Sequence, residues 1–114
     1  NLSSYLIKHE QSPHYLLLDA GTLFQGVLVA QQNKTLPQTP TPQGFINNHV
    51  AAALLTHTHL DHILGIAMGT TELIKPMPVY GLPHTIDELK QYIFNDITWP
   101  DLIKYKQIST HPIR

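Results

Sequence analysis

The fold class predicted for this 114-residue sequence is α/β, with strands and helices arranged in layers. Segments with the composition of β-strands alternate along the chain with segments whose apolar residues follow helical spacing. Residues 51–56 are apolar up to a final threonine, which is typical of a short buried strand. Apolar residues make up 42% of the chain, enough for one modest core. The sequence therefore predicts a single domain or part of one.

Two short strands joined by a turn are predicted to open the chain. Residues 2–8 and 15–20 have strand composition, and the polar segment between them contains Pro13, which suits a turn. The pair should form a β-hairpin. After the second strand, Gly21 allows a sharp exit. Asp19 stands among apolar residues and needs hydrogen-bond partners, so we expect it to brace a loop near the functional site.

The next two segments differ in how regular they are. Residues 23–32 have the apolar spacing of a short helix, although Val27, Leu28 and Val29 would equally suit a strand. Residues 33–44 combine prolines with threonine, glutamine and glycine, a composition that predicts an exposed loop. A lid over a substrate is the alternative role, and a plain surface connection is the preferred one.

The middle of the chain contains the predicted central strand and a helix. Residues 45–50 lead into the strand at 51–56, and a helix is predicted over residues 60–68. Gly69 is the predicted stop of that helix.

Strand and helix are predicted to alternate again toward the end of the chain. Residues 78–81 resemble a strand, and residues 85–95 a helix. The apolar positions Ile86, Leu89, Ile93 and Phe94 have helical spacing, so this helix should pack one face inward. A loop then begins at Trp99, and residues 105–108 are predicted to open another strand.

Four potential metal ligands occupy six residues directly after the central strand: His57, His59, Asp61 and His62. In an extended segment, residues two apart point the same way, so His57 and His59 can bind one ion together. Asp61 and His62 fall where the chain turns into a helix and can reach a second ion. Imidazole and carboxylate suit zinc, manganese or iron, and a chain without cysteine has no thiolate ligands. The pattern predicts a hydrolytic metal centre.

The alternative is that these are ordinary loop histidines and that Asp61 stabilises the helix N-terminus. That would explain Asp61 alone and leave the three histidines at ligand spacing unexplained. Four other histidines are most simply surface or capping residues: His9, His14, His49 and His84. For His84, contact with the substrate is an alternative.

Composition excludes some classes of function. The net charge is −1 and the seven lysines and arginines are scattered, which disfavours a nucleic-acid polymer as partner. No apolar stretch approaches the roughly 20 residues that cross a bilayer, so no membrane partner is expected and the domain should be soluble. Absence of cysteine suits either the cytoplasm or the periplasm. The chain opens on Asn1, so we expect preceding sequence to be missing and leave the compartment open.

The chain resembles the metallo-β-lactamase superfamily, whose signature is His-x-His-x-Asp-His in a strand-to-helix loop. Within it, residues 56–65 resemble the signature of class II cyclic-nucleotide phosphodiesterases, with Thr58 where serine is commoner. Residues 18–22, 79–86 and 93–100 also resemble that family, and the last of these segments is characteristic of it. The resemblance runs from about Ser3 to Leu102.

The resemblance implies a metallo-β-lactamase-like αββα sandwich of which residues 1–114 form the N-terminal half. It implies hydrolysis of 3′,5′-cyclic AMP, with cyclic GMP a further candidate, to the 5′-nucleotide by a hydroxide bridging two divalent ions. Zinc is the first choice of metal, and manganese or iron would also be accepted. His57 and His59 would bind the first ion, and His62 and the catalytic Asp61 the second. Further ligands would lie downstream, and no ligand role passes to His111.

By the same resemblance the partner is a small-molecule cyclic nucleotide, and a homodimer is left open. Phe94 and Trp99 offer aromatic faces for a base, but core packing is preferred for both. Competing interpretations are another hydrolase of the superfamily, acting on a lactone, thioester, sulfate ester or β-lactam, or a non-catalytic fragment. The segment 93–100 favours the cyclic nucleotide.

Overall fold

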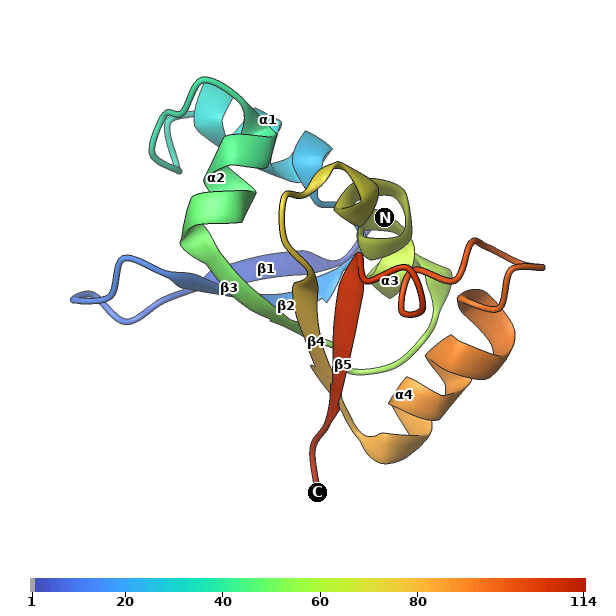
Figure 1. Ribbon diagram of the computed structural model, residues 1–114. Coiled ribbons are helices and arrows are strands. Elements are labelled where there is room, and N and C mark those ends of the chain that lie inside the picture. The colour runs from blue at the N-terminus through green and yellow to red at the C-terminus, as the bar shows by residue number, and fades with distance from the viewer. Residues whose placement is uncertain (1) are drawn as a thin grey trace.

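The computed structural model describes residues 2–114 and contains a five-stranded mixed sheet with four α-helices (Figure 1). The strands lie side by side in chain order. β1 (Ser4–Ile7) runs antiparallel to β2 (Tyr15–Ala20), whereas β3 (Val50–Leu54), β4 (Met77–Gly81) and β5 (Ile108–Pro112) extend the sheet in parallel. The predicted α/β class and the predicted hairpin are confirmed. Residues 2–114 form one sheet, so the second sheet of a sandwich stays a prediction.

The helices cover one face of this sheet. They are α1 (Phe24–Gln32), α2 (Pro42–His49), α3 (Leu60–Gly69) and α4 (Pro83–Glu88). Parallel strands in chain order are joined by right-handed crossovers, which place successive helices on the same side. Neighbouring strands bring Leu17, Ala53 and Val79 into one row, and these side chains are buried under the helices. The opposite face carries exposed apolar side chains: Tyr5, Ile7, Leu16 and Tyr80.

The structure settles the choice left open for residues 23–32, which form the helix α1. The hydroxyl of Thr22 accepts a hydrogen bond from the N–H of Gly26 at 3.1 Å, at the start of the helix. Val27 and Gln31, four residues apart, are both buried, which is the spacing of one helix face.

The predicted loop over residues 33–44 is too long, because α2 begins at Pro42. Thr41 is the N-cap, and its hydroxyl accepts a hydrogen bond from the N–H of Gly44 at 3.0 Å. Pro42 at the first helical position adds a second start signal. Residues 45–50 do lead into the strand, but the helix was missed: residues 45–49 belong to α2, and Phe45 and Ile46 are core residues.

The strand–helix unit β3–α3 was predicted, but β3 covers Val50–Leu54 rather than residues 51–56. α3 ends at Gly69, the predicted stop, although not by the expected cap. This glycine is the last residue of α3 and keeps a right-handed backbone with φ of −109°. The chain continues into a 3₁₀ turn over Thr70–Glu72, where the hydroxyl of Thr70 donates to the carbonyl of Ile66 at 2.9 Å. Gly69 thus does not end the helix by a left-handed cap.

The last helix and strand also shift from their predicted bounds. α4 begins at Pro83 rather than at residue 85 and continues into a π-helical turn, Leu89–Ile93. The N–H of Phe94 closes this turn on the carbonyl of Leu89 at 2.7 Å. The strand predicted at residues 105–108 begins only at Ile108, because turns occupy residues 102–106 and Lys106 adopts a left-handed φ of 62°.

Candidate functional site

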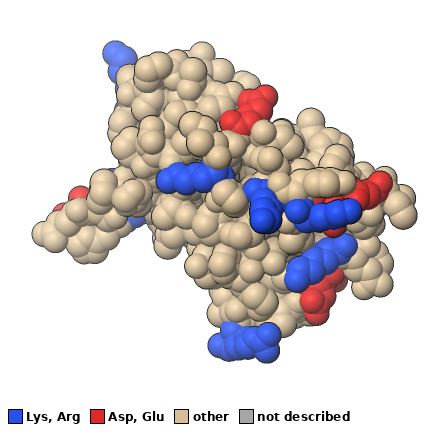
Figure 2. Space-filling view, in the orientation of Figure 1, with Lys and Arg blue, Asp and Glu red and all other residues tan. Residues whose placement is uncertain are grey.

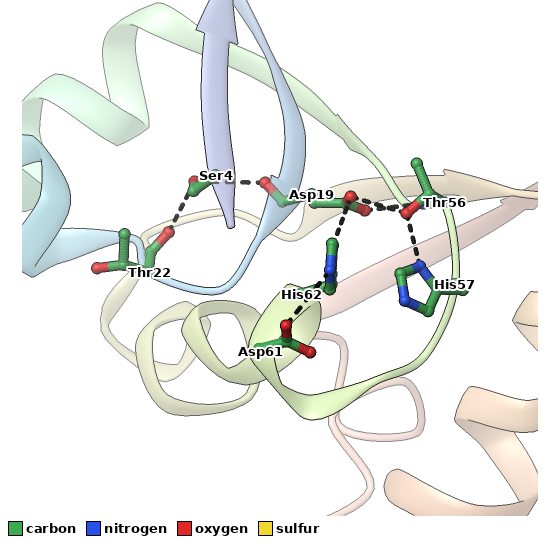
Figure 3. A network of polar contacts seen from close by, with 7 residues as sticks. All are labelled: Ser4, Asp19, Thr22, Thr56, His57, Asp61 and His62. Carbon is green, nitrogen blue, oxygen red and sulfur yellow. Dashed lines mark hydrogen bonds and ion pairs between the residues drawn. The ribbon is translucent and has the colours of Figure 1, made fainter. Parts of the chain in front are cut away.

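The segment of residues 57–62 lies at the carboxyl edge of the parallel strands (Figure 3). β3 ends at Leu54, and the N–H of Leu55 still donates to the carbonyl of Tyr80 in β4 at 2.8 Å. The chain then leaves the sheet and enters α3, for which His59 is the N-cap. Open α/β sheets bind their ligands at this edge, so the location suits a functional site.

Close backbone contact fixes the start of α3 against the end of β2. The N–H of Ser3 donates to the carbonyl of Asp61 at 2.9 Å, and the N–H of Gly21 donates to the carbonyl of Ser3 at 2.8 Å. A Cβ at Gly21 would lie 2.0 Å from the carbonyl oxygen of Asp61, so no other residue fits there unless the backbone moves. Gly21 therefore serves close packing beside the site. No glycine within residues 2–114 has a positive φ, so the exit from β2 does not use the conformational freedom of Gly21.

The structure brings the four predicted ligands together. The ring centroid of His57 lies 4.5 Å from that of His59 and 4.2 Å from that of His62. Asp61 Oδ2 lies 3.5 Å from His62 Nε2. Within residues 2–114, no group of three or more histidine, aspartate or glutamate side chains has the arrangement that would hold a metal ion. The metal role of the four residues stays a prediction.

Asp19 joins the end of β2 to this loop, as the sequence predicted. Its Oδ1 accepts the N–H of Thr56 at 2.8 Å. Its Oδ2 lies 2.7 Å from the hydroxyl of Thr56 and 2.8 Å from His62 Nδ1. Figure 3 shows contacts from the loop and from α3 converging on this one carboxylate of β2. Asp19 thus fixes both ends of the segment that contains the histidines.

The environment of Asp19 favours its ionised form. Burial raises the pKa of this carboxyl, but the hydrogen bonds from the N–H and hydroxyl of Thr56, together with the hydrogen bond and charge of His62, outweigh burial and hold the pKa below its ordinary value. The group is a carboxylate at neutral pH and can only accept hydrogen bonds.

Two residues near the site were not singled out from the sequence. Thr56 bonds Asp19 and also lies with Oγ1 2.8 Å from His57 Nδ1. Glu88, at the end of α4, accepts a hydrogen bond from the hydroxyl of Thr58 at 3.4 Å. The only sequence signal for Thr56 was its position directly before His57; the contact of Glu88 spans thirty residues and had no local signal.

Phe94 and Trp99 pack against the protein core, as preferred from the sequence. Phe94 is 1% exposed. Trp99 is half-buried against the core, and its Nε1–H donates to the carbonyl of Ala67 in α3 at 2.9 Å. His111 stacks on Tyr80, with ring centroids 4.7 Å apart on β5 and β4.

Fold and site together define an α/β protein with a histidine and carboxylate cluster at the carboxyl edge of its sheet. The chain belongs to the class II cAMP phosphodiesterase family, whose sequence model matches residues 1–111. It is 27% identical over 129 aligned residues to a 3′,5′-cyclic-nucleotide phosphodiesterase of Aliivibrio fischeri, covering 98% of this chain. It is 34% identical over 109 residues to a probable 3′,5′-cyclic-nucleotide phosphodiesterase of Yersinia pestis, covering 89% of this chain.

The fold is similar to the crystal structure of unliganded yeast PDE1, with a TM-score of 0.78 at 19% identity. That similarity covers 99% of this chain and 46% of the yeast chain. The chain spans 39% and 32% of the two bacterial relatives. It therefore corresponds to less than half of the proteins that it matches.

Proposed function

We propose that the protein containing this chain hydrolyses 3′,5′-cyclic AMP, and cyclic GMP as a second substrate, to the 5′-nucleotide. The observation that carries the proposal is the match of the class II family over residues 1–111, which includes the cluster at residues 57–62. The names of the bacterial relatives support a cyclic-nucleotide substrate.

The donor chemistry of the cluster fits two divalent metal ions, with zinc as our first choice. The cluster offers three imidazoles and one carboxylate, which form a nitrogen and oxygen donor set. The ring of His57 lies 4.5 Å from that of His59 and 4.2 Å from that of His62, measured between centroids. We assign His57 and His59 to one ion and Asp61 and His62 to the other. When bound, such ions supply Lewis acidity, which generates a nucleophile from water at neutral pH and stabilises the departing 3′ oxygen.

The residues of this chain would hold and orient these ligands. Ser3 and Gly21 fix the backbone of Asp61, while Asp19 fixes the ring of His62. Second contacts of this kind orient metal ligands and tune their affinity.

The charge distribution suits a small substrate better than a polymer. Figure 2 shows basic and acidic side chains interspersed on one face, without a continuous basic surface. The chain carries a net charge of −1, whereas nucleic-acid binding domains are strongly basic. No helix within residues 2–114 is long and apolar enough to cross a membrane.

The test is hydrolysis of cyclic AMP by the longest natural form of this chain, loaded with zinc or manganese, against a chelated sample. Metal-dependent formation of 5′-AMP is the expected result, and cyclic GMP is assayed in parallel. His59→Ala should abolish most of the turnover with little change in stability, because His59 is exposed.

His14→Ala is the matched control, since His14 is also exposed but lies in the β1–β2 turn. It should leave turnover unchanged. Bound metal without turnover of either nucleotide would overturn the substrate assignment. Equal turnover by the chelated and loaded samples would overturn the metal assignment.

A further inference from the structure

The hydroxyl of Thr56 lies between two polar partners on neighbouring elements. Its Oγ1 is 2.7 Å from Asp19 Oδ2 and 2.8 Å from His57 Nδ1. A hydroxyl has one proton to donate and lone pairs to accept with. One of these contacts must therefore use the hydroxyl proton, and the other must use a proton from the partner.

The contacts of Asp19 decide which contact is which. Its Oδ1 accepts the N–H of Thr56 at 2.8 Å and its Oδ2 accepts the hydroxyl of Thr56 at 2.7 Å, so the threonine uses its only hydroxyl proton on Asp19. Oγ1 can then only accept from His57, which places a proton on His57 Nδ1. The same carboxylate lies 2.8 Å from His62 Nδ1 and requires a proton there as well.

We infer that Asp19 and Thr56 are positioning residues that hold a proton on Nδ1 of both His57 and His62. In each ring Nε2 is then the nitrogen whose lone pair is left for a ligand. For His62 this atom is on the side of Asp61, 3.5 Å from its carboxylate oxygen. The carboxylate of Asp19 thus sets the proton position on two imidazole rings. It contacts His62 directly and acts on His57 through the hydroxyl of Thr56. The consequence for metal binding rests on the proposed function, whereas the proton positions do not.

Burial strengthens the hydrogen bonds by which Asp19 and Thr56 hold the ring protons. The side chain of Asp19 is 10% exposed and that of His62 is 20% exposed, so water competes little for their contact. Thr56 is exposed, but its backbone N–H also donates to Asp19, which holds the residue in place beside the carboxylate. Thr58, two residues along, lacks these partners and bonds Glu88 instead.

The proton positions can be read directly by nitrogen NMR of the histidine rings in the full-length protein. The sample is free of metal and held at about pH 8.5, where imidazoles are neutral. His57 and His62, assigned by single substitutions, should show the proton on Nδ1. Thr56→Val removes the hydroxyl and should move the proton of His57 to Nε2, while His62 keeps its own on Nδ1.

Two further variants control this experiment. Thr56→Ser restores a hydroxyl and should restore the wild-type pattern at His57. Thr58→Val makes the same change two residues away and should leave both rings unchanged. A wild-type His57 protonated at Nε2, or a Thr56→Val variant that keeps the proton on Nδ1, would overturn the inference.

Zinc affinity gives a readout of the consequence, measured with the metal alone by competition with a chromophoric chelator. Thr56→Val should weaken binding about 10- to 100-fold, the usual effect of losing such a contact, and Thr58→Val should not. Equal affinities in the two variants would overturn the positioning role of Thr56. Failure of cyclic-nucleotide hydrolysis with the expected proton positions would overturn only the proposed function.

Discussion

Gly65→Ala places a methyl group where α3 touches the backbone that leaves β2. A Cβ at Gly65 would lie 2.5 Å from the carbonyl carbon of Thr22, 2.7 Å from the carbonyl oxygen of Ala20 and 2.8 Å from the nitrogen of Leu23. All three are backbone atoms, so no side chain can rotate away. The closest contact would have to lengthen by about 0.9 Å to reach the ordinary limit of 3.4 Å.

The size of the effect follows from this displacement. Alanine in a helix gains about 1 kcal/mol over glycine, whereas forced overpacking costs about 1–3 kcal/mol. A helix that moves by about 0.9 Å also stretches the 2.8 Å contact between His62 Nδ1 and Asp19 beyond hydrogen-bond distance. Losing a charge-assisted bond costs about 1.5–3 kcal/mol. We expect Gly65→Ala to lower the free energy of unfolding by about 2–4 kcal/mol.

Urea unfolding of the full-length protein measures this change, followed by the signal of Trp99, whose ring packs beside α3. The matched control is Gly44→Ala in α2, where a Cβ would meet only the hydroxyl of Thr41 at 3.3 Å. That variant should change stability by less than about 1 kcal/mol. If Gly65→Ala proved as stable as the wild type, the argument that α3 needs glycine for its approach to β2 would be wrong.

Three more predictions follow from individual side chains. Asp61→Ala should remove most hydrolysis and bound metal in the full-length enzyme; activity near that of the wild type would refute its role as a ligand. Asp19→Asn should reduce stability at pH values above 3.8, the ordinary carboxyl pKa, because the ionised group is favoured in the folded state. Its deficit relative to the wild type should shrink as the pH falls through the lowered pKa of Asp19, and unfolding in a pH series that shows a constant deficit would contradict this sign. Thr85→Val should preserve or raise the melting temperature, since within residues 2–114 the buried hydroxyl of Thr85 has no hydrogen-bond partner; a clear fall in that temperature would show that the hydroxyl is satisfied.

The elements predicted best from the sequence are those whose signals are local. β2 was predicted at its observed bounds because its apolar run ends at Gly21. α3 differs from its prediction only at its end, because the histidine-containing segment marks where the helix starts. α2 was missed because the prolines of the preceding segment obscured the start signal of Thr41 and Pro42. The late start of β5 depends on the left-handed backbone of Lys106. Lysine rarely adopts this conformation, and no residue pattern around it predicts one.

In the candidate site, too, local features could be predicted and long-range contacts could not. The clustering of His57, His59, Asp61 and His62 was predictable because these residues are neighbours in sequence. The bond from His62 to Asp19 spans 43 residues and depends on the pairing of β2 with β3, which no local pattern specifies. Asp19 was recognised only as a polar residue in need of partners. Which partners it has, and hence which proton each histidine carries, required the assembled sheet.

The position of Asp61 bears on the alternative that it stabilises the helix N-terminus. It lies in the first turn of α3, where a carboxylate gains about 0.3–1 kcal/mol from the helix dipole. However, His59 is the N-cap and no side chain caps the helix by a hydrogen bond. The carboxylate of Asp61 is half-exposed and points toward His62 Nε2 instead. A cap would satisfy helix N–H groups, whereas this carboxylate lies accessible beside an imidazole, which argues against the capping alternative; the ligand role of Asp61 stays a prediction.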